Sequence, residues 1–148
     1  MSPSLLLPAT AMRSRRRLQW SLAVLAAVPL ASAGREIVLG PQGVPGGSPD
    51  VTPTVDSALR YANVFKFAVG PVIWSHLGRV ERSPGVTYAL ASIWVGGFAR
   101  LRSWQQRGRP HPVTVGAVAL ELAAPPLLIA WQRRIRARST SPAHGDVS

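Results

Sequence analysis

The chain has 148 residues, a formal net charge of +11 and no cysteine. The length fits one domain, and the lack of cysteine excludes disulfide bonds, thiolate metal sites and thiol catalysis. Apolar residues gather into four blocks instead of spreading with a short period. They predict an all-α fold, an integral membrane four-helix antiparallel bundle over 18–132. The predicted spans are about 18–33, 57–78, 86–101 and 113–131.

The positive charge comes from 16 arginines and one lysine, a composition that in another chain would suggest a nucleic acid partner. Their placement indicates membrane flanks instead, because arginines gather directly before the first apolar block and directly after the last. These arginines are Arg13, Arg15, Arg16 and Arg17, and then Arg133, Arg134, Arg136 and Arg138. We expect no nucleic acid partner, a basic tail over 1–17 and a basic disordered tail over 133–148. Translation could start at Met1 or at Met12.

The first apolar block, 18–33, also fits a cleaved signal peptide, because it follows a basic stretch and ends in a small-x-small sequence at 31–33. It is short for a span, which needs ~20 residues, but the preceding turn can extend it. We therefore expect it to be retained. Pro29 is expected to kink this helix where a neighbouring helix can satisfy the freed carbonyl.

The connection 34–54 is rich in glycine and proline, so we expect an extramembrane loop through which no helix runs. It is not a phosphate-binding loop, since it lacks both the Lys-Ser/Thr ending and a preceding strand. Asp56 or Ser57 is expected to cap the second span, because an N-cap oxygen accepts the free amide hydrogens of the first helical turn.

The second span carries two basic residues, Arg60 and Lys66. A charge at the bilayer centre costs at least ~2.5 kcal/mol, so each must face protein, water or a lipid headgroup. Asn63 follows Arg60 by three residues and shares its helix face. Pro71 is expected to bend the helix near its middle.

The third and fourth spans carry signals for close packing and for bending. Small residues in the third span allow two helix backbones to approach closely in lipid. These predicted packing residues are Ser92, Gly96 and Gly97. In the fourth span, Pro125 and Pro126 remove two backbone donors and are expected to kink the helix. One of those donors would have bonded the carbonyl of Glu121, so we expect that carbonyl to be free.

Arginine distribution predicts an inner-membrane protein with both termini in the cytoplasm, since most arginines then lie on the cytoplasmic side. The turn between the second and third spans contributes Arg79 and Arg82 to that side. The outer connection before the fourth span departs from this trend, with arginines at 100, 102, 107 and 109.

The charges inside the predicted spans form the candidate site, a cluster of Arg60, Lys66, Arg100 and Glu121. At ~1.5 Å per residue, Lys66 and Glu121 both lie near the middle of their spans, so we expect them to pair. Arg60 and Arg100 should lie on the same side of the membrane, because adjacent antiparallel spans share ends. An intramembrane ion pair can fix which helix faces which, or it can mark a proton, ion or headgroup pathway. Both interpretations remain open.

We expect a small multi-pass membrane protein with a structural or accessory role, more as a non-enzyme than as an enzyme. One alternative is a small proton-coupled transporter or carrier using Glu121, and another is a protein that binds or modifies lipid headgroups, with an anionic headgroup at Arg60 and Arg100. There is no nucleophile elbow and the histidines lack metal-ligand spacing, so no catalytic residue, metal or cofactor is predicted. Expected partners are membrane lipids and a second copy or another membrane protein.

Three short stretches resemble a known family. They are 56–61 opening the second span, 96–101 closing the third, and Glu121-Leu122 ahead of Pro125-Pro126. This pattern resembles the bacterial four-span membrane proteins grouped as domain of unknown function 4345, over roughly Leu18 to Gln132. The resemblance implies that the first span is kept and that Arg60, Arg100 and Glu121 belong to the family pattern, whereas Lys66 departs from its usual apolar span. It implies no activity.

Overall fold

The computed structural model describes residues 9–140, and all regular secondary structure in this part of the chain is helical. The long helices are α1 (Ala9–Leu39), α2 (Pro53–His76), α3 (Pro84–Arg107) and α4 (Pro112–Thr140). Two short 3-10 helices, η1 (Gly40–Gly43) and η2 (Leu77–Arg82), follow α1 and α2. The predicted all-α class is therefore confirmed for residues 9–140.

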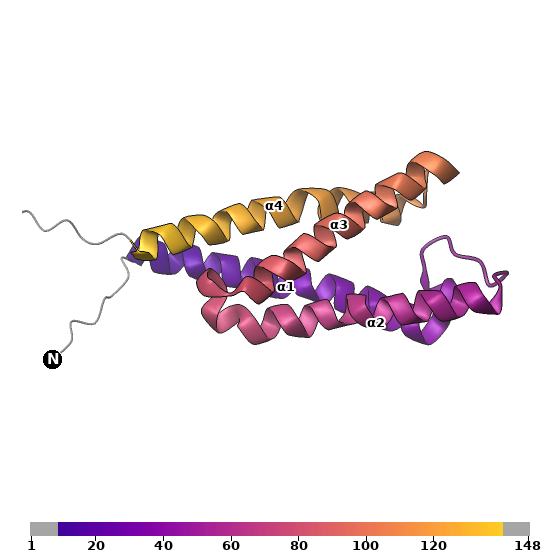
Figure 1. Cartoon of the computed structure of the whole chain (residues 1–148), viewed down its shortest axis with the longest axis horizontal. Coiled ribbons are helices and arrows are strands. Elements are labelled where there is room, and N and C mark those ends of the chain that lie inside the picture. Colours follow the sequence, from indigo (N-terminus) through magenta and orange to yellow (C-terminus); the bar gives the residue numbers. More distant parts are fainter. Residues whose placement is uncertain (1–8, 141–148) are drawn as a thin grey trace, which may run out of the picture.

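The four helices form two hairpins, α1 with α2 and α3 with α4 (Figure 1). The hairpins meet at one end of the molecule, where the start of α1, the end of α4 and η2 lie together. We call this the closed end. Towards η1 and the α3–α4 turn, α3 and α4 rise away from α1 and α2, and we call that the open end.

An apolar core joins the hairpins, mostly at the closed end. All four long helices and η2 contribute to it, so each helix buries one stripe against the others. Its buried members are Leu18, Leu22, Ala26, Ile73, Val80, Val86, Ala89, Leu90, Leu128 and Ile135. Burial of a large aliphatic side chain contributes about 1.5–3 kcal/mol in water, whereas in lipid the same contacts act through close packing.

Side chains from α1 and α4 hold η2 in place by bonding its backbone. The buried amide of Gln132 donates to the carbonyls of Val80 and Ser83 at 2.6 and 3.0 Å, and it accepts from Thr87. From the other side, Gln19 donates to the carbonyl of Leu77 at 2.7 Å. Carbonyls that the irregular turn leaves without helical partners are thereby satisfied.

An ion pair between Arg15 and Glu81 adds to this attachment, with 2.9 Å between Nε and Oε2. Burial alone would raise the pKa of the Glu81 carboxyl. The hydrogen bond from Arg15, a backbone hydrogen bond and the charges of Arg15 and Arg82 outweigh burial and hold that pKa below its usual value. The closed end thus keeps a carboxylate among its many arginines.

The helices run further than the predicted spans. The expectation that no helix enters 34–54 is wrong, because α1 continues past Gly34 to Leu39 and ends only at the adjacent Gly40 and Pro41. Similarly, α1 begins at Ala9 inside the predicted basic tail, and α4 continues to Thr140 inside the predicted C-terminal tail. Arginines do not interrupt a helix, since arginine is a good helix former. The rest of both predicted tails lies outside the described residues.

The second helix starts earlier than expected. Thr52 is its N-cap and accepts from the amide of Val55 at 3.3 Å, with Pro53 at the first helical position. The expected cap at Asp56 or Ser57 is therefore wrong, since proline at the first position needs no donor and favours a start there. The third helix begins in the same way, with Ser83 as cap before Pro84.

The four prolines predicted to kink the spans all lie inside helices that continue past them, at Pro29, Pro71, Pro125 and Pro126. One freed carbonyl has a partner on the neighbouring helix: the indole of Trp94 donates to Leu122, four residues before Pro126, at 3.1 Å. A side chain on α3 thus replaces the hydrogen bond that proline removes from α4.

Two segments are long and apolar enough to cross a membrane, Met12–Gly43 and Pro112–Arg138. Only 22% and 17% of their most apolar windows are buried within the protein, so neither resembles the core helix of a water-soluble domain. Large apolar side chains also lie exposed on the other two helices, among them Tyr61, Phe65 and Val95.

Candidate functional site

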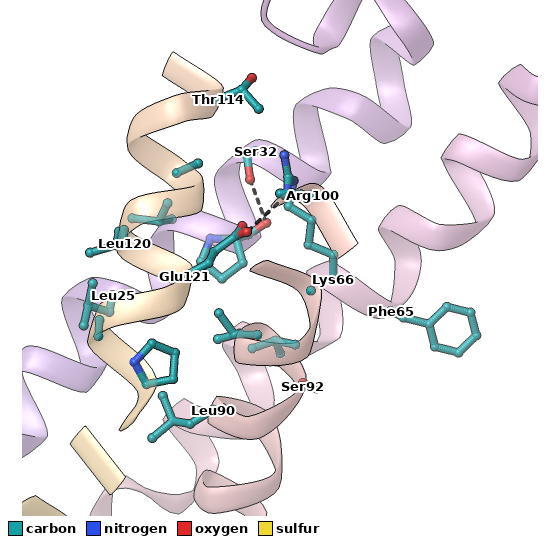
Figure 2. Close-up of a pocket in the computed structure, with 18 of the residues that line it drawn as sticks. Leu25, Ser32, Phe65, Lys66, Leu90, Ser92, Arg100, Thr114, Leu120 and Glu121 are labelled. Carbon is teal, nitrogen blue, oxygen red and sulfur yellow. Dashed lines mark hydrogen bonds and ion pairs between the residues drawn. The ribbon is translucent and has the colours of Figure 1, made fainter. Parts of the chain in front are cut away.

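A cavity of about 460 Å³ lies between the two hairpins and is lined by all four helices (Figure 2). Its wall is mainly apolar, with Leu25, Leu90 and Leu128 on the side of the closed end. Four charged side chains interrupt that wall, and each comes from a different helix: Glu36, Lys66, Arg100 and Glu121. This volume is within the range of small-molecule binding sites.

The four charges form two ion pairs, and each pair belongs to one hairpin. Glu36 on α1 binds Lys66 on α2, with 3.0 Å between Oε1 and Nζ. Arg100 on α3 faces Glu121 on α4, with 3.2 Å between Nε and Oε2. The expected pair of Glu121 with Lys66 is not formed in this structure. The ion pairs therefore close each hairpin but do not bind one hairpin to the other.

Glu36 is the member of this group that the sequence analysis missed. The apolar block predicts a helix end at 33 and a loop at Glu36, whereas α1 continues to Leu39 and carries Glu36 beside α2. Glu36 is buried, with 8% of its surface exposed. The apolar residues 37–39 directly after it, with no glycine or proline before Gly40, were the signal for a longer helix.

Arg60 lies apart from the other three predicted cluster residues. Its guanidinium pairs with Asp56 one turn earlier, at 2.9 Å, and donates to the carbonyls of Ile37 and Val38 near the end of α1. Arg60 thus caps α1, where the last carbonyls of a helix lack partners. Asn63, predicted to share the helix face of Arg60, donates to the carbonyl of Leu59 in its own helix.

Hydrogen-bonding capacity remains unused inside the cavity. Oε2 of Glu121 is buried and, within residues 9–140, accepts no hydrogen bond of good geometry, although Arg100 lies beside it. The terminal guanidinium nitrogens of Arg100 have no described partner, and Lys66 has one described hydrogen bond for its three donors. The side chains of Arg100 and Lys66 are 36% and 24% exposed, so their remaining donors are accessible to water or to a ligand.

Of the small residues predicted for helix packing, only Gly97 lies at a tight helix contact. A Cβ at Gly97 would come within 3.0 Å of the Leu122 side chain and 3.1 Å of the Glu121 Cβ. Around Gly96 nothing lies within 4 Å, and both Gly96 and Ser92 line the cavity. The absence of a side chain at Gly97 thus allows α3 to approach the turn of α4 that carries Glu121.

The loop after η1 closes over the open end. A Cβ at Gly46 would lie 3.2 Å from the Cβ of His111 in the α3–α4 turn, and Pro45 beside it lines the cavity. Loop and turn thus meet although they belong to different hairpins. Residues 9–140 contain no group of three or more histidine or acidic residues arranged to hold a metal ion.

Comparison with known proteins identifies one family. The family model described as domain of unknown function (DUF4345) matches residues 17–132. The chain belongs to this family. The match confirms the resemblance seen in the sequence and includes α1 from residue 17 onwards. No curated protein and no solved structure matches the chain.

The close contact at Gly97 predicts different outcomes for two adjacent glycines. Gly97→Leu should lower the free energy of unfolding by about 1–3 kcal/mol, because the new side chain meets α4. Gly96→Leu enters open space and should change stability by less than about 0.5 kcal/mol. Denaturant unfolding in detergent, followed by circular dichroism, measures both. Equal losses in the two variants would contradict this packing.

Proposed function

We propose that this DUF4345 protein is a four-span inner-membrane protein that binds an amphiphile in the cavity between its hairpins. Membrane insertion is supported by the two long apolar segments and by the large apolar side chains exposed on all four helices. In water such a surface would drive aggregation, whereas in lipid it is the required exterior. The more polar α2 and α3 would cross the membrane packed against α1 and α4.

Retention of the first span is part of this proposal. Leu18, Leu22 and Ala26 of α1 are almost fully buried in the core that joins the hairpins, so a chain cleaved after 33 would lose one wall of that core. The family match also covers most of this helix, from residue 17 onwards. Both observations favour a resident helix over a removed signal peptide.

The orientation follows from the charges at the two ends of the bundle. The closed end carries the arginines of both flanks and of η2, which favours a cytoplasmic position for this end and for both termini. The open end, with the 44–52 loop, would then face the opposite side.

The observation that carries the binding role is the distribution of polar groups in the cavity. Partly unsatisfied charged groups lie on one side, near Ser32, and an apolar wall of Leu25 and Leu90 lies on the other (Figure 2). This arrangement suits a molecule with a polar head and an apolar tail.

A proton-coupled carrier is a second candidate, favoured by Glu121 alone. An intramembrane carboxylate with a buried oxygen that accepts no described hydrogen bond is suited to protonation. Such a carrier would lose transport in Glu121→Gln while keeping its fold, whereas simple amphiphile binding needs no proton transfer at this residue.

The proposed topology is testable because the sequence has no cysteine. In whole cells, Ser48→Cys in the loop should react with a membrane-impermeant maleimide, and Arg79→Cys in η2 should react only after the inner membrane is opened. Labelling of Arg79→Cys in intact, outer-membrane-permeabilised cells would contradict the orientation, and unrestricted labelling of both would contradict membrane insertion.

Filling the cavity should displace its occupant. Ala117 lines the cavity on α4, so Ala117→Trp should reduce co-purified lipid, measured by extraction and mass spectrometry after purification in a maltoside detergent, to the background level. Ala119 is exposed on the same helix and does not line the cavity, so Ala119→Trp is the matched control and should retain the wild-type amount. Equal lipid in both variants would contradict amphiphile binding in this cavity.

A further inference from the structure

We infer that the amphiphile bound in the cavity carries a zwitterionic headgroup, an anionic and a cationic group joined in one neutral head; this inference rests on the proposed binding function. The geometry behind it is the arrangement of Glu36, Lys66, Arg100 and Glu121 around one cavity. Two cations and two anions face the same space, one of each from each hairpin.

The first reason is charge balance. The formal charges of the four groups sum to zero, so the empty cavity is neutral. A net anion or a net cation would leave one uncompensated charge in a mainly apolar environment, which is strongly unfavourable. A head with one charge of each sign adds nothing to the net charge. Neutral heads without charges also keep the balance, but they offer the ionic groups no charge-assisted hydrogen bond beyond the two existing ion pairs.

The second reason is that both signs have unused bonding capacity. Arg100 offers the terminal nitrogens of its guanidinium, whose fork matches phosphate and carboxylate oxygens, and Lys66 offers further ammonium donors. Glu121 offers its second carboxylate oxygen, Oε1, for which no hydrogen bond is described, while its buried Oε2 lies 3.2 Å from Nε of Arg100. A purely anionic head would contact the two bases and bring no cation to the Glu121 carboxylate. A head that also carries an ammonium group places a positive charge beside this carboxylate.

The third reason is the position of the charges relative to the apolar wall. In Figure 2, Lys66, Arg100 and Glu121 point towards one region beside Ser32, with Thr114 on one side and Leu25 and Leu90 on the other. Along α3 and α4, residues 90 and 128 of the wall lie towards the closed end, and residues 100 and 121 lie towards the open end. A head at the charged groups would therefore direct its tail towards the closed end.

The inference is tested with probes that share one tail and differ in the head. Dodecylphosphocholine, dodecyl phosphate, dodecyltrimethylammonium and dodecyl maltoside are compared below their micelle concentrations on protein held in amphipol, by isothermal titration calorimetry. We expect the phosphocholine probe to bind at least about tenfold more tightly than the other three. Free phosphocholine, which has the head without the tail, should show no binding at the same concentrations, which separates a lipid headgroup from a soluble zwitterion.

Charge variants supply a readout that loss of structure would not produce. Glu121→Gln leaves the cavity one unit positive and should shift the preference towards dodecyl phosphate. Arg100→Gln leaves it one unit negative and should shift the preference towards dodecyltrimethylammonium. Arg102→Gln, on an exposed residue of α3 that does not line the cavity, should keep the wild-type order.

The outcomes separate this inference from the proposed binding function. If all four tailed probes bind wild type equally and Ala117→Trp abolishes their binding, the cavity recognises only the tail and the zwitterion inference is overturned. Tighter binding of dodecyl phosphate by the wild type also overturns it. If no tailed probe binds, or if Ala117→Trp leaves binding unchanged, the proposed binding function itself fails.

Discussion

The structure depends on how charges inside the helices are neutralised. Four charged side chains lie among apolar surfaces, where an unpaired charge costs several kcal/mol. Each is neutralised by its partner within the same hairpin, Glu36 by Lys66 and Glu121 by Arg100. Because no ion pair among these four charges crosses between the hairpins, the hairpins are joined by the apolar core and the hydrogen bonds of Gln132 at the closed end, and by the contact of Gly46 with His111 at the open end. The space near the charges consequently remains a cavity.

Backbone features bring the second ion pair to its position. Gly97 allows α3 to approach α4 at Glu121 and Leu122, and Trp94, one turn earlier, satisfies the carbonyl that Pro126 frees. These contacts surround the turn of α4 that carries Glu121. A bulky residue at 97 would therefore disturb both the packing and the direction of the carboxylate. The contact that packs α3 against α4 at Gly97 is therefore also the contact that positions Glu121.

Much of the helical architecture was predictable from local signals. The apolar blocks placed all four long helices, and the short sequences around Arg60, Arg100 and Glu121 pointed to the family that the comparison confirms. Less predictable were features that depend on two segments at once. From its place in the sequence Gln132 is a polar residue flanking the last span. It is nevertheless buried, because its amide donates to the carbonyls of Val80 in η2 and of Ser83 directly after η2. Nothing local to Gln132 indicates that turn.

The pairing of the charges was harder to predict, because it depends on where the first helix ends. A helix that ends at 33 leaves Glu36 in a loop, and Glu121 is then the acid at the depth of Lys66. Six further residues of α1 place Glu36 beside Lys66 and leave Glu121 to Arg100. The depth of each residue along its predicted span does not reveal this pairing. Depth compares positions along each helix but does not show which helix faces lie together.

Double-mutant cycles test most directly whether neutralisation occurs within each hairpin. Neutralising Glu36 and Lys66, Arg100 and Glu121, and as a cross-hairpin pair Lys66 and Glu121, singly and together, gives three coupling energies from denaturant unfolding in detergent. Within each hairpin we predict couplings of about 0.5–3 kcal/mol, with the double variant less destabilised than the sum of the single variants. For Lys66 with Glu121 we predict a coupling below about 0.5 kcal/mol. A larger coupling for Lys66 with Glu121 than for either within-hairpin pair would contradict the account.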